Sequence, residues 1–179
     1  NGKKISNLNI AYLFDTITGE VRSLTLDESC TFKNASVARW LVGGKVFNCK
    51  NYGSILPECK DVNNSRDADA GGIVQDALAG SEILDCVNYG KIEMQSTGAN
   101  FARIGGITAY VSNSIIRNCH NYGDLNAGTP AESYYGSDGN YAGGIAGQAS
   151  GDSTIVGCSN HGRVTAGGYI GGILGLIKN

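Results

Sequence analysis

The hexapeptide NCKNYG at positions 48–53 returns as DCVNYG at 85–90, NCHNYG at 118–123 and GCSNHG at 157–162. The tripeptide Gly-Gly-Ile keeps step with it, at 71–73, 105–107, 143–145 and 171–173. From the second glycine of each tripeptide to the next cysteine there are 14, 13 and 14 residues. Repetition at such a period is typical of repeat proteins, in which each unit stacks on its neighbour.

The apolar runs between these markers are short and β-branched, and Gly, Asn and Asp bound them, as in ILDC at 83–86. Such runs indicate strands. The shortest unit, from Gly144 to Gly172, has 28 residues and cannot bury its apolar face alone. We therefore expect an all-β parallel β-helix, or β-solenoid, of about five to six coils that forms a single domain over residues 1–179. Leu24 occupies the cysteine slot of an early unit, so the array starts near the N-terminus.

The repeated cysteines are expected to form a buried column of small apolar side chains, because equivalent residues of stacked coils lie about 4.8 Å apart. Leucine in the same slot supports this role, since leucine is neither a ligand nor a nucleophile. Zinc sites need ligands at close local spacing, whereas these cysteines lie 37, 33 and 39 residues apart. We expect free thiols and no metal in the column, which comprises Cys49, Cys86, Cys119 and Cys158. Whether Cys30 and Cys59 pair is left open.

The asparagines two residues further on are expected to form a second ladder at a corner of the solenoid, with their amides bonded to one another. They are Asn51, Asn88, Asn121 and Asn160. The glycines that end the hexapeptides are expected to supply the positive φ of a sharp bend. The residues between them, Tyr52, Tyr89, Tyr122 and His161, form either an exposed platform for sugar rings or a row that covers the corner, and we favour the row.

The other half of each unit varies in length, and insertions on one face of a repeat array are commonly binding sites. The insertions Ile55 to Ala70, Glu93 to Arg103 and Asp124 to Tyr141 are expected to leave from the same corner. The third contains Tyr134, Tyr135, Asp138 and Tyr141, a mixture that suits contact with a glycan or a protein. The alternative is a solvated loop without a ligand.

Alternating oxygen-bearing residues in the first insertion are a weak candidate for a calcium site: Asp61, Asn63, Ser65, Asp67 and Asp69. The glycine and the glutamate that a calcium loop needs at its sixth and twelfth positions are replaced by Arg66 and Gly72. We therefore favour a plain polar loop.

Charge and hydropathy exclude two classes of partner. The chain has 14 basic and 16 acidic residues without a basic stripe, so we expect no nucleic-acid partner. No stretch approaches the ~20 apolar residues that span a bilayer, so we expect no membrane span. No motif indicates a cofactor.

Units that read GGIxG, then an apolar strand, then IxNCxNxG resemble the GLUG motif, and residues 143–147 and 171–175 carry the resemblance best. Gln75 and Ala109 stand where the third glycine is expected. The resemblance implies a β-helical module of a secreted or surface-attached bacterial protein, often part of a longer chain, and it implies no catalytic residues.

Two functions follow as expectations. One is a non-catalytic, adhesin-like extracellular module that presents its corner loops to a glycan or a cell-surface protein, beside neighbouring domains. The alternative is a β-helical polysaccharide lyase or hydrolase, which would need paired carboxylates, or a carboxylate and a basic residue, gathered on one face. Acidic residues do not recur at one repeat position, which favours the first function.

Overall fold

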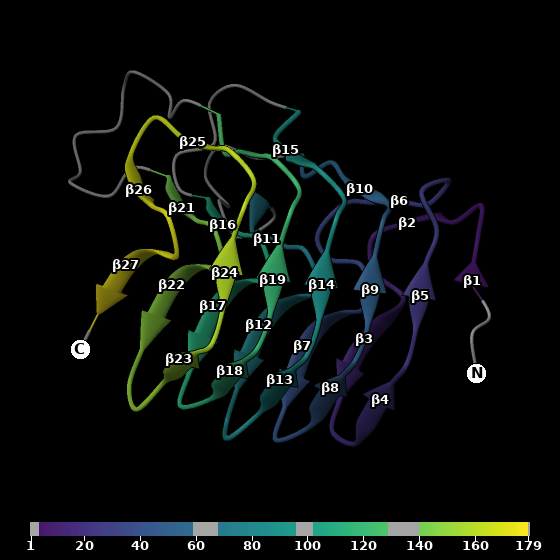
Figure 1. The fold of residues 1–179 in the computed structure, drawn as a ribbon, viewed down its shortest axis with the longest axis horizontal. Coiled ribbons are helices and arrows are strands. Elements are labelled where there is room, and N and C mark those ends of the chain that lie inside the picture. The colour runs from purple at the N-terminus through teal and green to yellow at the C-terminus, as the bar shows by residue number, and fades with distance from the viewer. Residues whose placement is uncertain (1–3, 59–67, 96–101, 129–139, 179) are drawn as a thin grey trace.

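The computed structural model describes residues 4–58, 68–95, 102–128 and 140–178. Nearly all of its regular structure is β-strand, arranged in coils that follow one another along one axis (Figure 1). Its parallel sheets, which we name A to E, are visited by each complete coil in the order C, D, A, B, E. The predicted parallel β-solenoid is confirmed. No helix within the described residues is long and apolar enough to cross a membrane.

Sheets A and B lie on either side of the corner made by the hexapeptides. Sheet A contains β1 (Lys4–Ile5), β5 (Thr25–Leu26), β9 (Lys50–Asn51), β14 (Val87–Asn88), β19 (His120–Asn121) and β24 (Ser159–Asn160). Sheet B contains β2 (Asn9–Ile10), β6 (Thr31–Phe32), β10 (Ser54–Ile55), β15 (Ile92–Glu93), β20 (Leu125–Asn126) and β25 (Val164–Thr165). Six strands in each sheet agree with the expected five to six coils.

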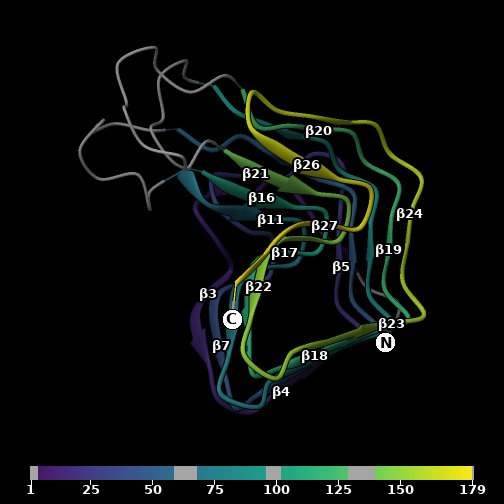
Figure 2. The same cartoon turned by 90° about the vertical axis from the view of Figure 1, so that its left-hand side faces the viewer.

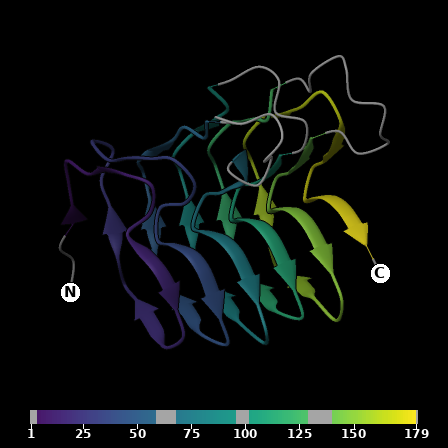
Figure 3. The same ribbon diagram turned by 180° about the vertical axis from the view of Figure 1, so that it is seen from behind.

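Sheets C, D and E complete the coil. Sheet C, seen from behind in Figure 3, contains β3 (Phe14–Ile17), β7 (Ala38–Val42), β12 (Val74–Leu78), β17 (Thr108–Ser112), β22 (Ala146–Ser150) and β27 (Leu174–Lys178). Sheet D contains β4 (Glu20–Arg22), β8 (Lys45–Phe47), β13 (Glu82–Leu84), β18 (Ile115–Arg117) and β23 (Thr154–Val156). Sheet E contains β11 (Ala70–Gly71), β16 (Arg103–Gly105), β21 (Tyr141–Gly143) and β26 (Tyr169–Gly171).

Strand pairing places the repeated residues level with one another. Val46 pairs with Ile83, and Ile83 pairs with Ile116, and all three are fully buried. Burying side chains of this size contributes roughly 1.5–3 kcal/mol each. Because β4 pairs with β8 and β5 pairs with β9, Leu24 lies level with Cys49, as the sequence predicted.

Sheets E and C approach each other closely, since the chain turns back sharply between them (Figure 2). A Cβ atom on Gly147 would lie 2.8 Å from the backbone nitrogen of Ile104, and one on Gly175 would lie 3.0 Å from Ala142. The third glycine of the GGIxG pattern therefore allows backbone to pack on backbone. Gln75 and Ala109 fill this position in the earlier coils, where both are buried.

The three insertions leave sheet B and return at sheet E. The strands that precede them, β10, β15 and β20, are hydrogen-bonded neighbours, as are β11, β16 and β21, which follow them. The bases of the insertions therefore lie side by side at one corner, as expected. Most of each insertion, at 59–67, 96–101 and 129–139, lies outside the described residues.

Candidate functional site

The cysteine column is an internal structural element. Cys49, Cys86 and Cys119 are fully buried, and Cys158 in the last coil is half-buried. Each thiol donates to the carbonyl two residues before it, as Cys86 Sγ does to the Leu84 oxygen at 3.2 Å. Hydrogen bonds with the thiols of Cys119 and Cys49, followed by burial, raise the pKa of Cys86 well above its ordinary value. The thiols are free, as predicted, and their burial inside the coils is that of small core side chains.

Cys30 is also a free, buried thiol, and it stands level with Gly53. Cys59 lies outside the described residues. Across the described ranges, no three His, Cys, Asp or Glu side chains are grouped so that they could hold a metal ion.

The asparagines form the predicted ladder of amide–amide hydrogen bonds. The Nδ2 atom of each donates to the Oδ1 atom of the next at 2.8 Å, from Asn51 to Asn88, Asn121 and Asn160. Each Nδ2 also donates to the carbonyl of the glycine two residues on, at 2.7–2.9 Å. These bonds satisfy side chains that would otherwise be costly to bury, so the ladder holds the corner in register.

The corner glycines have a different role from the one expected. Positive φ is found at the residue before the cysteine, with 51° at Asn48, 52° at Asp85 and 53° at Asn118, and not at the glycines that end the hexapeptides. A Cβ atom on Gly90 would instead collide with the carbonyl oxygen of Gly53 in the preceding coil. Glycine is needed there for close stacking, whereas asparagine and aspartate supply the left-handed bend.

The aromatic column consists of stacked rings. Centroids lie 4.6 Å apart for Tyr52 and Tyr89, 5.1 Å for Tyr89 and Tyr122, and 4.6 Å for Tyr122 and His161, with interplanar angles of 6–11°. Lys4 Nζ lies 5.6 Å from the Tyr52 ring on the N-terminal side. The rings cover one another's faces inside the column, so it is mainly ring edges that are exposed there. Because a sugar ring stacks on a free aromatic face, this geometry favours a covering row over a sugar platform.

A serine and both histidines of the chain meet beside the aromatic column. His120 Nδ1 lies 2.8 Å from Ser159 Oγ, and Ser159 Oγ lies 3.0 Å from His161 Nε2. No carboxylate of the described residues hydrogen-bonds to either imidazole, so the third group that orients the base of a nucleophilic triad is not found in this part of the chain.

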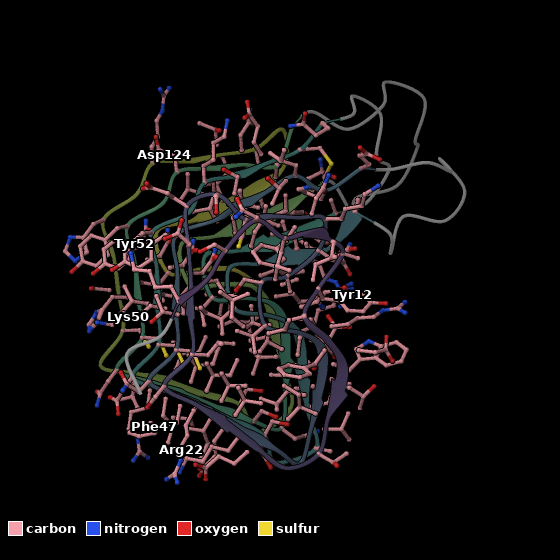
Figure 4. All side chains as sticks on the ribbon, turned by 90° about the vertical axis from the view of Figure 1, so that its right-hand side faces the viewer. Tyr12, Arg22, Phe47, Lys50, Tyr52 and Asp124 are labelled. Carbon is pink, nitrogen blue, oxygen red and sulfur yellow. The ribbon has the colours of Figure 1, made fainter. Side chains whose placement is uncertain are left out.

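A polar hollow of about 440 Å³ lies on the outer face of sheet B, next to the bases of the insertions. Lys91 is ion-paired with Glu93 at 2.7 Å, and Asp124 Oδ1 accepts the backbone N–H of Arg163 at 2.8 Å. Figure 4 shows Asp124 and Tyr52 projecting from the same side of the solenoid. The charges balance, which suits hydroxyl-bearing ligands better than strongly charged ones.

One residue at the end of each insertion stands level with its counterparts in the neighbouring coils: Asp69, Arg103 and Tyr141. Asp69 is fully buried, and its carboxylate accepts the backbone N–H of Arg103 at 2.7 Å and the guanidinium Nε–H at 2.9 Å. Burial alone would lower the pKa of Arg103, but the charge and hydrogen bonds of Asp69 raise it. This ion pair ties the base of the first insertion to that of the second.

Asp76 on β12 faces the same pair from sheet C. Burial, followed by the charge of Asp69, raises its pKa to about 6, although Arg103, a hydrogen bond from the Trp40 side chain and Arg39 act in the opposite direction. Its Oδ1 atom is buried without a hydrogen-bond partner among the described residues. The Arg103 guanidinium also lies 4.5 Å from the Tyr110 ring centroid. Two carboxylates and an arginine are therefore gathered on one face, but they are largely shielded from solvent.

Of the four residues predicted to form the binding loop's contact surface, only Tyr141 lies within the described residues. Tyr134, Tyr135 and Asp138 lie outside the described residues. Tyr141 is fully buried, with its ring centroid 5.3 Å from that of Tyr169, because β21 lies inside sheet E. It is thus a core residue and offers no exposed ring to a ligand.

Of the candidate calcium residues, only Asp69 lies within the described residues. Asp61, Asn63, Ser65 and Asp67 lie outside the described residues, and Asp69 is bonded to Arg103. A carboxylate held by a guanidinium in this way is a poor candidate for a calcium ligand.

Sequence reasoning missed Trp40, Asp76, Arg103 and Tyr110 as a cluster. Trp40, Asp76 and Tyr110 stand level with one another in sheet C through strand pairing, and the sharp turn between sheets E and C adds Arg103. The sequence signal that could have found them is the position of Asp69 and Arg103 directly after two insertions. No family model matches this chain, and no curated protein matches it.

Proposed function

We propose that this chain is a non-catalytic, adhesin-like module of an extracellular bacterial protein that presents its inserted loops to a glycan or a protein. The observation that supports this proposal is the stacking of all three insertion bases at one corner. A rigid solenoid holds those bases at the strand spacing of about 4.8 Å, so neighbouring loops can contribute to one surface.

The buried polar contacts at this corner support the same proposal. Besides the Asp69–Arg103 pair, Asn140 accepts the Ala102 N–H at 3.0 Å and donates to the Ala127 carbonyl at 2.7 Å. These bonds fix the points where the second and third insertions begin or end. Bases that are already fixed add no entropic cost of their own when a ligand binds.

Glycan-array binding and calorimetry with the intact chain test this function. The Tyr134→Ala, Tyr135→Ala double variant is expected to lose binding, whereas Tyr122→Ala, which removes a ring from the aromatic column, is expected to keep it. Binding that survives in the double variant and fails in Tyr122→Ala would assign the ligand to the column. If neither glycans nor surface proteins bind, the proposal is wrong.

The alternative is a β-helical lyase or hydrolase, and one observation favours it. Asp76, with a pKa of about 6, is suited to exchange a proton near neutral pH, and it lies beside a second carboxylate and an arginine. Turnover of acidic polysaccharides that disappears in Asp76→Asn would establish catalysis. Saturable glycan binding without bond cleavage would exclude it for the glycans tested.

A further inference from the structure

The two histidines of the chain converge on one hydroxyl group, although they lie in different coils. The ring nitrogens His120 Nδ1 and His161 Nε2 approach Ser159 Oγ to 2.8 and 3.0 Å, so they lie no more than 5.8 Å apart, the sum of those distances. The chain contains no other histidine. Stacking of two coils brings the two histidines close together, because His120 on β19 pairs with Ser159 on β24.

The surrounding structure holds both imidazoles in place at the surface. The His161 ring is stacked on Tyr122 with an interplanar angle of 6°, which leaves its ring nitrogens free of the stack. His120 is half-buried on the outer face of sheet A, and His161 is exposed. The site is therefore accessible, and both imidazoles stand beside one hydroxyl group before any ligand arrives.

No other pair of coils repeats this arrangement. Lys50 and Val87 stand level with His120 in the preceding coils, and tyrosine stands at the positions equivalent to His161. His161 thus departs from a repeated tyrosine in the coil next to the one that carries His120, and His120 stands at a position that varies among the coils.

We propose that His120 and His161 form a surface site for a divalent transition-metal ion of the Zn²⁺, Ni²⁺ or Cu²⁺ class. Neutral imidazole is a preferred ligand of these ions. Metal–nitrogen bonds of about 2.0–2.1 Å place two imidazole nitrogens on one ion roughly 3–4 Å apart, which small side-chain rotations at the surface can reach. Ser159 Oγ then hydrogen-bonds to a metal-bound water, and further waters complete the coordination.

This site is independent of the proposed loop function. It lies on sheet A and the hexapeptide corner, whereas the insertions lie between sheets B and E. A failure of glycan binding would leave the metal site untouched, and a failure of metal binding would leave the loop proposal untouched.

Titration of the intact chain with Ni²⁺, followed by calorimetry and by paramagnetic broadening of NMR signals, tests the proposal. One ion is expected to bind per chain and to broaden the signals of both histidine rings first. Two variants taken from the chain's own repeat keep the fold: His161→Tyr continues the tyrosine column, and His120→Val copies Val87. Each is expected to weaken Ni²⁺ binding at least tenfold, since even the loss of an outer-shell partner costs 10–100-fold.

Two controls make the result decisive. Cys158→Ser changes the neighbouring half-buried thiol and is expected to leave binding unchanged, and circular dichroism checks that each variant is folded. Affinity that persists in His120→Val and His161→Tyr, or that is lost in Cys158→Ser, would overturn the assignment.

Discussion

Replacement of Asn88 by alanine should destabilise the solenoid more than almost any other polar substitution. Asn88 is fully buried, and its amide donates at 2.8 Å to both the Gly90 carbonyl and Asn121 Oδ1. It also accepts from Asn51 Nδ2 at 2.8 Å. Alanine removes all three bonds and leaves the Asn51 donor and the Asn121 acceptor without their partner inside the corner.

The magnitude follows from these orphaned groups. A buried donor or acceptor left unpaired costs about 1–3 kcal/mol, so these two groups, together with the Gly90 carbonyl, predict a loss of at least about 3 kcal/mol. Typical unfolding free energies are about 5–15 kcal/mol, so this loss is a large fraction of the total. Asn160 provides the matched control, because it is half-buried in the last described coil and receives a ladder bond only from Asn121. Asn160→Ala should cost about 1 kcal/mol.

Urea unfolding followed by circular dichroism measures both variants against the wild type. A large loss for Asn88→Ala and a small loss for Asn160→Ala would establish that the ladder acts through buried, mutually satisfied amides. Equal losses at the two positions would refute this reasoning, because they would mean that position in the ladder, and hence burial, does not matter.

Three further outcomes are expected. Gly106→Ala should prevent stable folding, because its Cβ atom would collide with the Gly144 carbonyl of the next coil. Gly172→Ala has open space around it and should leave the melting temperature unchanged, so thermal melts of the two variants test this difference. Asp76 carries a raised pKa, so the folded state binds its proton more tightly than the unfolded state does. Its contribution to stability is therefore greatest below about pH 3.8 and falls by roughly 3 kcal/mol by the time the pH passes 6. Asp76→Asn should remove this fall of the unfolding free energy with pH, measured by urea titrations between pH 4 and 8. An unchanged pH dependence in the variant would contradict the role given to Asp76. A thiol reagent should modify half-buried Cys158 much faster than Cys86, because Cys86 is fully buried and out of the reagent's reach. Equal rates, monitored by mass spectrometry of the native chain, would count against a closed column.

The structural roles of residues that recur at a nearly constant spacing could be predicted from the sequence. The 13 or 14 residues between each Gly-Gly-Ile and the next cysteine require strands of fixed length, so like residues must stack on like. The cysteine column, the asparagine ladder and the place of Leu24 all follow from this one constraint. The φ of the corner glycines was wrongly predicted, because a short sequence does not distinguish glycine needed for a left-handed bend from glycine needed for close approach.

The amino-acid sequence by itself determined the stacked, parallel architecture and the identity of its ladders, because both depend on periodicity along the chain. Tertiary structure alone decided that Tyr141 is buried and that Asp76 faces the Asp69–Arg103 pair. It alone showed that both imidazoles lie within hydrogen-bond distance of Ser159. The Asp76 contact depends on the angle at which sheet E turns back onto sheet C, and the histidine contacts depend on the side-chain orientations around Ser159. Neither quantity is encoded in the spacing of any one repeat.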